Sequence, residues 1–179
     1  MEIGIIGQGF VGNAVYQKFR KYYAVLTYDI QAKLCNATNE EIFNICDVIF
    51  VCLPTPMEKD GSCHTGIVEA ELRDLDEKCR FEDKKKIVVV KSTVPPGTTE
   101  KWNFKFTNLK IVFNPEFLTE ANAVSDYENQ NRIILGGPRA ATTKLKPIFA
   151  KVFPQASIIK TDSTYAEMVK YVTNSFLAT

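Results

Sequence analysis

The stretch that decides the fold is MEIGIIGQGFVG, residues 1–12. Residues 3–6 form a short apolar run that predicts a β-strand, and residues 12–21 predict a helix. Between them, GQGFVG at residues 7–12 fits the pattern G-x-G-x-x-G. The pattern alone is weak, but here it follows a predicted strand and opens a predicted helix. In that context it indicates a dinucleotide-binding turn.

Each glycine of this turn has its own physical reason. Gly7 permits the tight turn, Gly9 lets a diphosphate approach the backbone because it has no Cβ, and Gly12 lets the helix pack close to the strand. The amides of Phe10 and Val11 would then point at the phosphates, with the positive end of the helix dipole behind them. We therefore expect the turn to bind the diphosphate of a dinucleotide.

Asp29 closes the next predicted strand, residues 25–28. A carboxylate about 20 residues after the first glycine can accept both hydroxyls of the adenosine ribose, and it would repel a 2′-phosphate. NAD is therefore favoured over NADP as the cofactor. The alternative is an ordinary glycine turn followed by a surface aspartate, and the combination of strand, helix and acid argues against it.

Predicted strands and helices alternate along the rest of the chain. Apolar strands separated by helices indicate a mostly parallel sheet covered on both faces. The predicted class is α/β, a Rossmann-type, doubly wound, mostly parallel sheet in three layers, with residues 1–179 forming a single domain. The further predicted strands are 47–53, 87–90, 109–113, 132–135 and 156–160, and the further predicted helices are 39–44, 67–79, 138–152 and 163 onward.

The composition narrows the classes of partner. Lys and Arg number 22 against 21 Asp and Glu, so no charge excess points to nucleic acid or an anionic membrane. No segment approaches the ~20 apolar residues of a membrane span, and no signal peptide is evident. The five cysteines include no C-x-x-C pair, which argues against a metal site or disulfide framework and for a cytoplasmic location.

Three unusual loops follow predicted strands, at the edge where open parallel sheets bind ligands. A helical turn over residues 116–120 would point two carboxylates the same way, and paired acids separate their pKa values so that one suits a general base. Spacing alone fits rigid turns and solvated glutamates better. The residues offered are Thr55 from LPTPMEKDGSCHTG (53–66), Ser92 and Thr93 from KSTVPPGTT (91–99), and Glu116 and Glu120 from NPEFLTEANAVSD (114–126).

The last predicted helix places two polar residues on one face. Lys170 and Asn174 are four residues apart and so lie one turn above the other. A capping box T-x-x-E at Thr164 and Glu167 predicts where the helix begins. The only histidine, His64, is expected to be a surface residue of the first loop.

Six strings together resemble the UDP-glucose/GDP-mannose dehydrogenase family, in the family's order and over nearly the whole chain. NPEFL followed by a glutamate, and K-x-x-x-N in the last helix, are the specific motifs among them. The strings are IGIIGQGFVG, VCLPTPMEKDGSC, VVVKSTVPPGTT, VFNPEFLTEANAVSD, RIILGG and AEMVKYVTNSFLAT.

The resemblance implies oxidation of the C6 alcohol of a nucleotide sugar to a carboxylate in two NAD-dependent steps. It casts Glu116 as the base in thioester hydrolysis, Thr93 as a holder of the catalytic water, and Lys170 as a cation that stabilises negative charge on the C6 oxygen, with Asn174 nearby. The implied NAD-binding residues are Gly7, Gly9, Phe10, Val11, Gly12, Asp29, Lys33, Thr55, Thr93 and Glu120. The implied sugar-binding residues are Glu116, Phe117, Leu118, Thr119, Glu120, Lys170 and Asn174.

The resemblance also implies a second domain, reached through a long central helix, that binds the nucleotide and carries a nucleophilic cysteine in a glycine-rich segment. None of the five cysteines here lies in such a segment. The expected partners are a UDP- or GDP-sugar, and either a second copy in a homodimer or another chain that supplies the cysteine. Without a thiolate to trap the aldehyde, we expect NAD binding with little or no turnover.

Two alternatives stay open. One is a standalone NAD-binding protein, regulatory or a partner subunit. The other is a β-hydroxyacid-type dehydrogenase fragment, which would also use a lysine in a later helix but does not account for NPEFL and STVPPGT. His64 and Ile67 replace an Asp and a Tyr that are common in the family, and the stretch between Asp29 and Asp47 is short.

Overall fold

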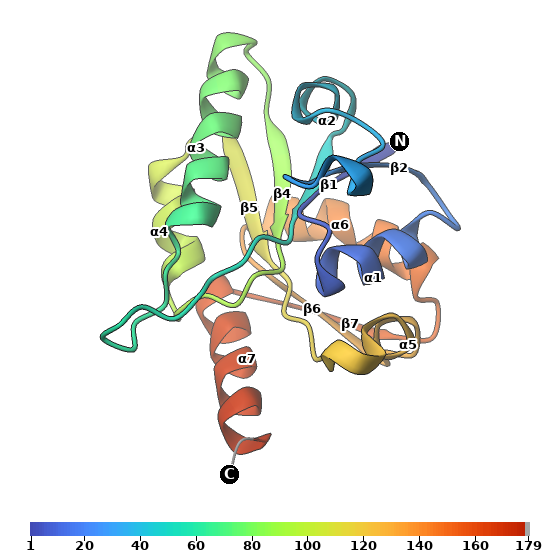
Figure 1. The fold of residues 1–179 in the computed structure, drawn as a ribbon, viewed down its shortest axis with the longest axis vertical. Coiled ribbons are helices and arrows are strands. Elements are labelled where there is room, and N and C mark those ends of the chain that lie inside the picture. The colour runs from blue at the N-terminus through green and yellow to red at the C-terminus, as the bar shows by residue number, and fades with distance from the viewer. Residues whose placement is uncertain (178–179) are drawn as a thin grey trace.

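The computed structural model describes residues 1–177 and shows a seven-stranded sheet with helices on both faces (Figure 1). Ala178 and Thr179 lie outside the described residues. The strand order is β2-β1-β3-β4-β5-β6-β7. The strands are β1 (Glu2–Ile6), β2 (Ala24–Tyr28), β3 (Val48–Val51), β4 (Lys86–Val90), β5 (Leu109–Phe113), β6 (Arg132–Gly136) and β7 (Ser157–Thr161).

Most strand pairs are parallel. Neighbours from β2 to β5 run parallel, as do β6 and β7. β5 and β6 are antiparallel and pair only between Phe113 and Gly136. A Cβ at Gly136 would lie 2.4 Å from the Cβ of Ala166, so the last helix packs directly on the sheet there. The predicted Rossmann-type, mostly parallel sheet in three layers is confirmed.

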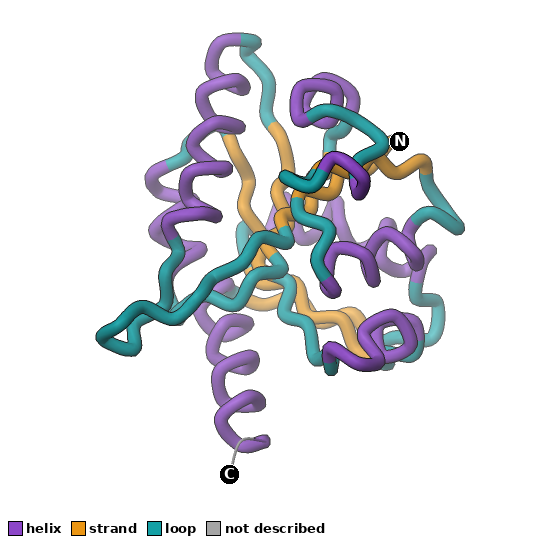
Figure 2. The backbone as a smooth tube through the Cα atoms, viewed as in Figure 1, coloured by secondary structure: helices purple, strands orange, loops and turns teal. Residues whose placement is uncertain are grey.

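Each face of the sheet has its own hydrophobic core and its own helices (Figure 2). Alternate side chains of β1 enter opposite cores, as the period of two requires: Ile3 and Ile5 face one core and Ile6 the other. One face is covered by α1 (Phe10–Phe19), α5 (Ala123–Glu128) and α6 (Arg139–Val152), and the other by α2 (Asn39–Ile45), α3 (Gly66–Phe81), α4 (Thr98–Lys105) and α7 (Ser163–Leu177).

Two helices, α4 and α5, were not predicted from the sequence. α4 buries one large side chain, Trp102, so its apolar periodicity is too weak to indicate a helix. It is held instead by a distant carboxylate: Glu167 of α7 accepts the N–H of Gly97 at 2.6 Å and of Thr99 at 2.8 Å. These bonds satisfy backbone amides at the start of α4, which have no intrahelical acceptor.

The predicted capping box of α7 is therefore wrong. Glu167 points to α4 rather than back to Thr164. The start of α7 is held by Asp162, whose side chain accepts the N–H of Tyr165 at 2.9 Å, the bond expected of an N-cap residue.

Candidate functional site

A cleft of about 880 Å³ runs along the carboxyl ends of the first four strands. Strands β1, β2, β3 and β4 each end in a loop that lines it, and β5 contributes Glu116. We call one end the β2 side, formed by residues 28–31, Leu34 and the facing part of α3. The other is the β4 side, formed by residues 52–55, residues 91–93 and Glu116.

The glycine turn between β1 and α1 lines the middle of the cleft. Gly7 has φ +93°, and a Cβ there would lie 2.5 Å from the Cys52 carbonyl oxygen; a Cβ at Gly12 would lie 1.9 Å from the Gly7 carbonyl oxygen. Gly9, by contrast, would meet nothing within 4 Å. Gly7 and Gly12 are thus required by the fold, whereas Gly9 keeps a cleft-lining position open to a ligand.

The first amides of α1 are available to an anion. The first intrahelical bond runs from the N–H of Asn13 to the carbonyl of Gly9, at 2.9 Å. The amides of Phe10 and Val11 precede it in the helix and have no intrahelical acceptor. Both residues line the cleft, and the positive end of the helix dipole lies there. This arrangement suits a phosphate.

Asp29 lies at the end of β2 with its carboxylate fixed by two backbone amides. Oδ2 accepts the N–H of Gln8 at 2.7 Å, and Oδ1 accepts the N–H of Gln31 at 2.8 Å. The Cys35 thiol donates to the Asp29 carbonyl oxygen at 3.0 Å and supports the turn from behind. Each carboxylate oxygen keeps a further lone pair for a donor in the cleft, as two vicinal hydroxyls would require.

Lys33 does not reach the cleft wall. It is exposed in a short 3-10 helix, Ala32–Leu34, and the neighbouring Leu34 lines the cleft in its place.

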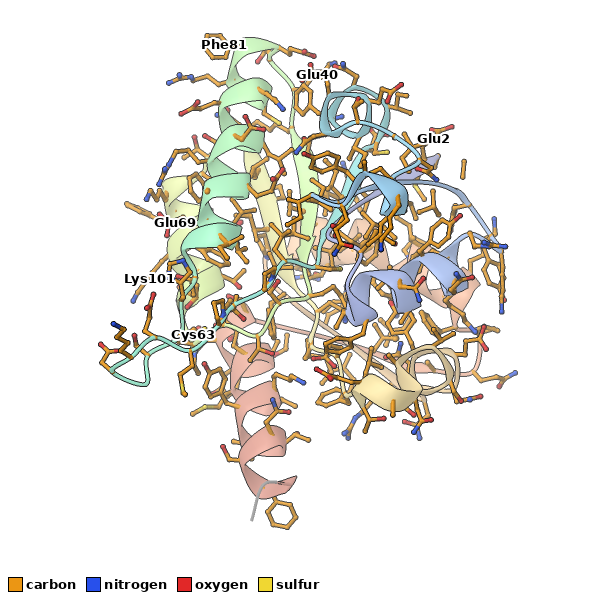
Figure 3. The ribbon with its side chains drawn as sticks, in the orientation of Figure 1. Glu2, Glu40, Cys63, Glu69, Phe81 and Lys101 are labelled. Atoms are coloured by element: carbon orange, nitrogen blue, oxygen red, sulfur yellow. The ribbon has the colours of Figure 1, made fainter. Side chains whose placement is uncertain are left out.

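Thr55 and Thr93 tie two strand-end loops together on the β4 side. The Thr55 hydroxyl donates to the Thr93 carbonyl oxygen at 2.8 Å, and the Ser92 hydroxyl donates to the Leu53 carbonyl oxygen at 2.6 Å. Both threonines line the cleft. The Cys63 thiol lies 3.6 Å from the same Thr93 oxygen, at the base of the projecting loop (Figure 3). The predicted loops are thus brought together.

Glu116 and Lys170 form a buried ion pair on the β4 side. Lys170 Nζ lies 2.8 Å from Glu116 Oε1 and donates to the Glu116 carbonyl oxygen at 2.7 Å. The remaining carboxylate oxygen accepts the N–H of Leu118 at 2.9 Å. Both side chains are less than one tenth exposed, so a cation and a proton acceptor are fixed side by side at the cleft.

The segment after Glu116 does not pair two carboxylates. The helical turn over residues 116–120 does not form; a 3-10 helix begins only at Glu120, and its side chain is exposed. Glu120 is therefore not paired with the buried Glu116. Thr119 turns its hydroxyl to Asp126 at 2.8 Å, and Phe117 packs under Lys170, whose Nζ lies 5.8 Å from the ring centre.

Asn174 lies one turn beyond Lys170 on α7 and is exposed. Of the predicted substrate residues, Glu116 is the one that lines the cleft among the described residues, with Lys170 directly behind it.

Lys91 is the residue that sequence reasoning missed. It directly follows β4, is 1% exposed, and its Nζ donates to Asn114 Oδ1 at 2.9 Å. Burial lowers the pKa of the Lys91 ammonium to about 8, against the opposing effect of Glu116. Asn114 in turn donates to the Ile134 carbonyl at 2.7 Å. One feature of the sequence could have indicated this residue: Lys91 directly follows a continuous β-branched run, so it lies where a buried strand ends.

The thiol that lines the cleft, Cys52, is a poor nucleophile. All five cysteines are free. Cys52 lines the cleft, and burial raises the pKa of its thiol to about 12; burial also raises the pKa of Cys46 to about 11. Within residues 1–177, no group of His, Cys, Asp and Glu is arranged to hold a metal ion, and no helix has the length and apolar character to cross a membrane.

Comparison with known proteins connects this cleft to one family. Residues 23–155 match the family model described as UDP-glucose/GDP-mannose dehydrogenase family, NAD binding domain. The chain is 32% identical to the UDP-glucose 6-dehydrogenase AglM of Haloferax volcanii, over 99% of this chain and 51% of that protein. It is 34% identical to the UDP-glucose 6-dehydrogenase TuaD of Bacillus subtilis, over 74% of this chain and 30% of that protein.

Solved structures of dehydrogenases have the same fold as this chain. A UDP-glucose dehydrogenase from Pyrobaculum islandicum superposes with a TM-score of 0.87 and 28% identity, covering 99% of this chain and 50% of that one. A GDP-mannose dehydrogenase from Pseudomonas aeruginosa, at 24% identity and a TM-score of 0.85, shares the fold. The chain thus spans about half the length of these proteins or less. The chain belongs to the UDP-glucose/GDP-mannose dehydrogenase family and matches its NAD-binding domain, as the sequence motifs predicted.

Proposed function

We propose that residues 1–179 form the single NAD-binding domain of a nucleotide-sugar 6-dehydrogenase, which oxidises the C6 alcohol of a UDP-glucose-type substrate to a carboxylate. The observation that carries the proposal is one continuous cleft, which joins the glycine turn and Asp29 to the ion pair of Glu116 and Lys170. The names of the relatives, which are UDP-glucose 6-dehydrogenases, support the substrate class.

The residues of the cleft fit NAD. The open space at Gly9 admits a diphosphate to the amides of Phe10 and Val11, and Asp29 offers two fixed acceptors to the ribose hydroxyls. Bound NAD supplies the acceptor for the hydride that leaves the sugar. Thr55 and Thr93 would lie at its nicotinamide end. Lys33 and Glu120 lie away from the cleft wall, and we assign them no contact with the cofactor.

The β4 side supplies the charges that the oxidation needs. The Lys170 ammonium would stabilise negative charge that develops on the C6 oxygen, because it is a fixed cation in a nearly dry site. Glu116 would accept a proton from a water held by Thr93. Phe117, Leu118 and Thr119 would shape the sugar side through backbone and packing, and Asn174 would contribute from α7.

The nucleophilic thiol must come from outside these residues. Buried thiols with a raised pKa, such as Cys52, are scarcely ionised at neutral pH and attack poorly. We propose that a nucleotide-binding domain, in this protein, in a second copy or in a partner chain, supplies the cysteine and holds the nucleotide sugar. The five free thiols favour a cytoplasmic location.

Calorimetry with NAD and NADP tests the cofactor part of the proposal. We expect the chain to bind NAD more tightly than NADP. Asp29→Asn should weaken NAD binding by about tenfold and reduce the preference over NADP, because hydrogen bonds to a charged acceptor are worth about 1.5–3 kcal/mol. Asp83→Asn, at an exposed turn, is the control.

Absence of any heat with NAD would contradict the cofactor assignment. Steady NADH formation from UDP-glucose by residues 1–179 alone would contradict the claim that the thiol is supplied from elsewhere.

A further inference from the structure

The β2 side of the cleft is closed by one face of helix α3. Ile67, Ala70, Glu71 and Asp74 all line the cleft, and their spacing places them on one side of a helix. The same cleft is lined by Ile30 and Leu34, from the segment after β2, and by the glycine turn. This end lies beyond Asp29, away from Glu116. A dinucleotide held by its ribose at Asp29 would place its adenine here.

Large apolar side chains are left exposed on both walls of this end. Ile30 is 94% exposed, Ile67 is 40% exposed and Leu34 is 36% exposed. Exposed apolar side chains that face one another across a pocket are typical of a site that covers a flat apolar group. A purine ring has that shape and would bury them.

Glu71 is a polar residue of the α3 wall whose carboxylate can accept further hydrogen bonds. It is half-buried, and Oε1 accepts the side-chain N–H of Asn39 at 3.0 Å. No basic side chain of residues 1–177 forms an ion pair with it. Burial raises the pKa of the Glu71 carboxyl above its ordinary value, against the opposing effect of the Asn39 hydrogen bond; the charges of Asp74 and Lys78 act in opposite directions.

Two neighbouring acids of α3 already have basic partners. Glu69 lies on the face toward α4, where it pairs with Lys105 and accepts the indole N–H of Trp102 at 3.4 Å (Figure 3). Asp74 pairs with Lys78 at 2.8 Å. Glu71 therefore differs from Glu69 and Asp74 in lining the ligand pocket without a direct ion pair, although Lys78 acts on its carboxyl from a distance. A carboxylate in this position is a candidate acceptor for a ligand donor.

We infer that the Glu71 carboxylate accepts a hydrogen bond from the exocyclic amino group of the adenine. Asn39 is the positioning residue that fixes the other carboxylate oxygen. The inference rests on the NAD assignment made above. The amino group donates two N–H bonds, and an unpaired carboxylate oxygen is the acceptor that it fits. A base with a carbonyl oxygen at the same ring position has no N–H there. Its oxygen would face the Glu71 carboxylate, and two acceptors cannot form a hydrogen bond. Glu71 thus determines specificity for the base of the cofactor.

Calorimetric titration with NAD and with nicotinamide hypoxanthine dinucleotide, which carries a carbonyl in place of the amino group, tests this inference. We expect the wild-type chain to bind NAD at least about tenfold more tightly than the hypoxanthine analogue. Glu71→Gln should bring the two affinities within about threefold, because the amide can donate to the carbonyl and accept from the amino group. Glu77→Gln makes the same charge change at an exposed position of α3 and should keep the wild-type ratio.

Asn39→Ala provides a second variant if Glu71→Gln does not fold. It removes the hydrogen bond that holds the Glu71 carboxylate in place. It should therefore also reduce the ratio of the NAD affinity to the hypoxanthine-analogue affinity, though by less than Glu71→Gln. Tight NAD binding with an unchanged ratio in both variants, or a wild-type chain that binds both dinucleotides equally, would overturn the role of Glu71 and leave the NAD assignment standing. Failure of the wild-type chain to bind either dinucleotide would overturn both.

Discussion

The two ends of the cleft are built in different ways. The β2 side and the adjoining glycine turn come mainly from one unbroken stretch, in which β1, the turn, α1 and β2 follow one another, with α3 as the facing wall. Their ligand groups are mostly backbone amides and the carboxylate of Asp29. The β4 side is assembled from loops and a helix that are distant in sequence. Lys170 pairs with Glu116 across 54 residues, and Glu167 holds Gly97 across 70.

This difference separates binding from stability. On the β2 side, the open position at Gly9 has no neighbour to disturb, so a change there alters the ligand space and leaves the fold intact. On the β4 side, the functional groups are buried charges, and a buried charge is costly once its partner is removed. Mutations on the β4 side should therefore destabilise the domain, whereas those on the β2 side should weaken cofactor binding.

Removal of the Lys170 ammonium is the strongest test of this contrast. Lys170→Met leaves the Glu116 carboxylate buried without its cation, and we expect a loss of about 3–5 kcal/mol in the free energy of unfolding, measured by urea denaturation. ADP-ribose, which occupies only the β2 side and the diphosphate site, should still bind the folded fraction within about threefold of wild type.

The double variant Lys170→Met/Glu116→Gln controls for the buried charge. It removes the unpaired carboxylate and should recover part of the lost stability, because replacement of both partners of a buried ion pair costs less than loss of one. Equal stability of Lys170→Met and wild type, or a large loss of ADP-ribose affinity, would show that the two ends are not separate in the way proposed.

The glycine turn allows the same contrast within one loop. Gly12→Ala places a Cβ 1.9 Å from the Gly7 carbonyl oxygen, so we expect a loss of about 1–3 kcal/mol in the free energy of unfolding. Gly9→Ala meets nothing within 4 Å, and its backbone φ of −63° is ordinary for alanine. It should melt close to wild type, yet bind NAD about tenfold more weakly, because its methyl group occupies the diphosphate space. An unchanged NAD affinity for Gly9→Ala would remove the diphosphate from that position.

The same division explains what the sequence could predict. The glycine turn and Asp29 are local features, and their spacing was sufficient to locate them. The strands were predicted to within a few residues because burial on both faces gives continuous apolar runs. The pairing of Glu116 with Lys170 depends on how α7 packs on the sheet. The spacing of residues along the chain does not predict that packing.

Particular errors show where local rules failed. Thr164 and Glu167 satisfy a capping-box pattern, yet Glu167 bonds to Gly97 and Thr99, because the start of α4 lies beside it and has unsatisfied amides. The helical turn over residues 116–120, considered as one possibility, does not form. There the Glu116 side chain takes the N–H of Leu118, and such a bond competes with helix formation.

Lys91 offers the subtlest test, because its charge depends on pH. Burial lowers the pKa of its ammonium from 10.5 to about 8, so between these values the unfolded chain binds more protons than the folded one. Stability therefore rises with pH across this window, and the contribution is lost as pH falls through the folded pKa. Lys91→Met removes this linkage and also leaves Asn114 Oδ1 without its donor.

The measurement is the difference in unfolding free energy between wild type and Lys91→Met at two pH values. We expect that difference to grow in favour of wild type by about 1 kcal/mol between about pH 8 and about pH 9. The Cys52 thiol also has a pKa shifted by burial, but Cys52 is present in both proteins. Its contribution to the pH dependence of stability therefore largely cancels in the difference. Lys101→Met, at an exposed position of α4, should show no such growth. A constant difference for Lys91→Met would mean that the buried ammonium keeps an ordinary pKa, because the charge of Glu116 fully offsets the effect of burial.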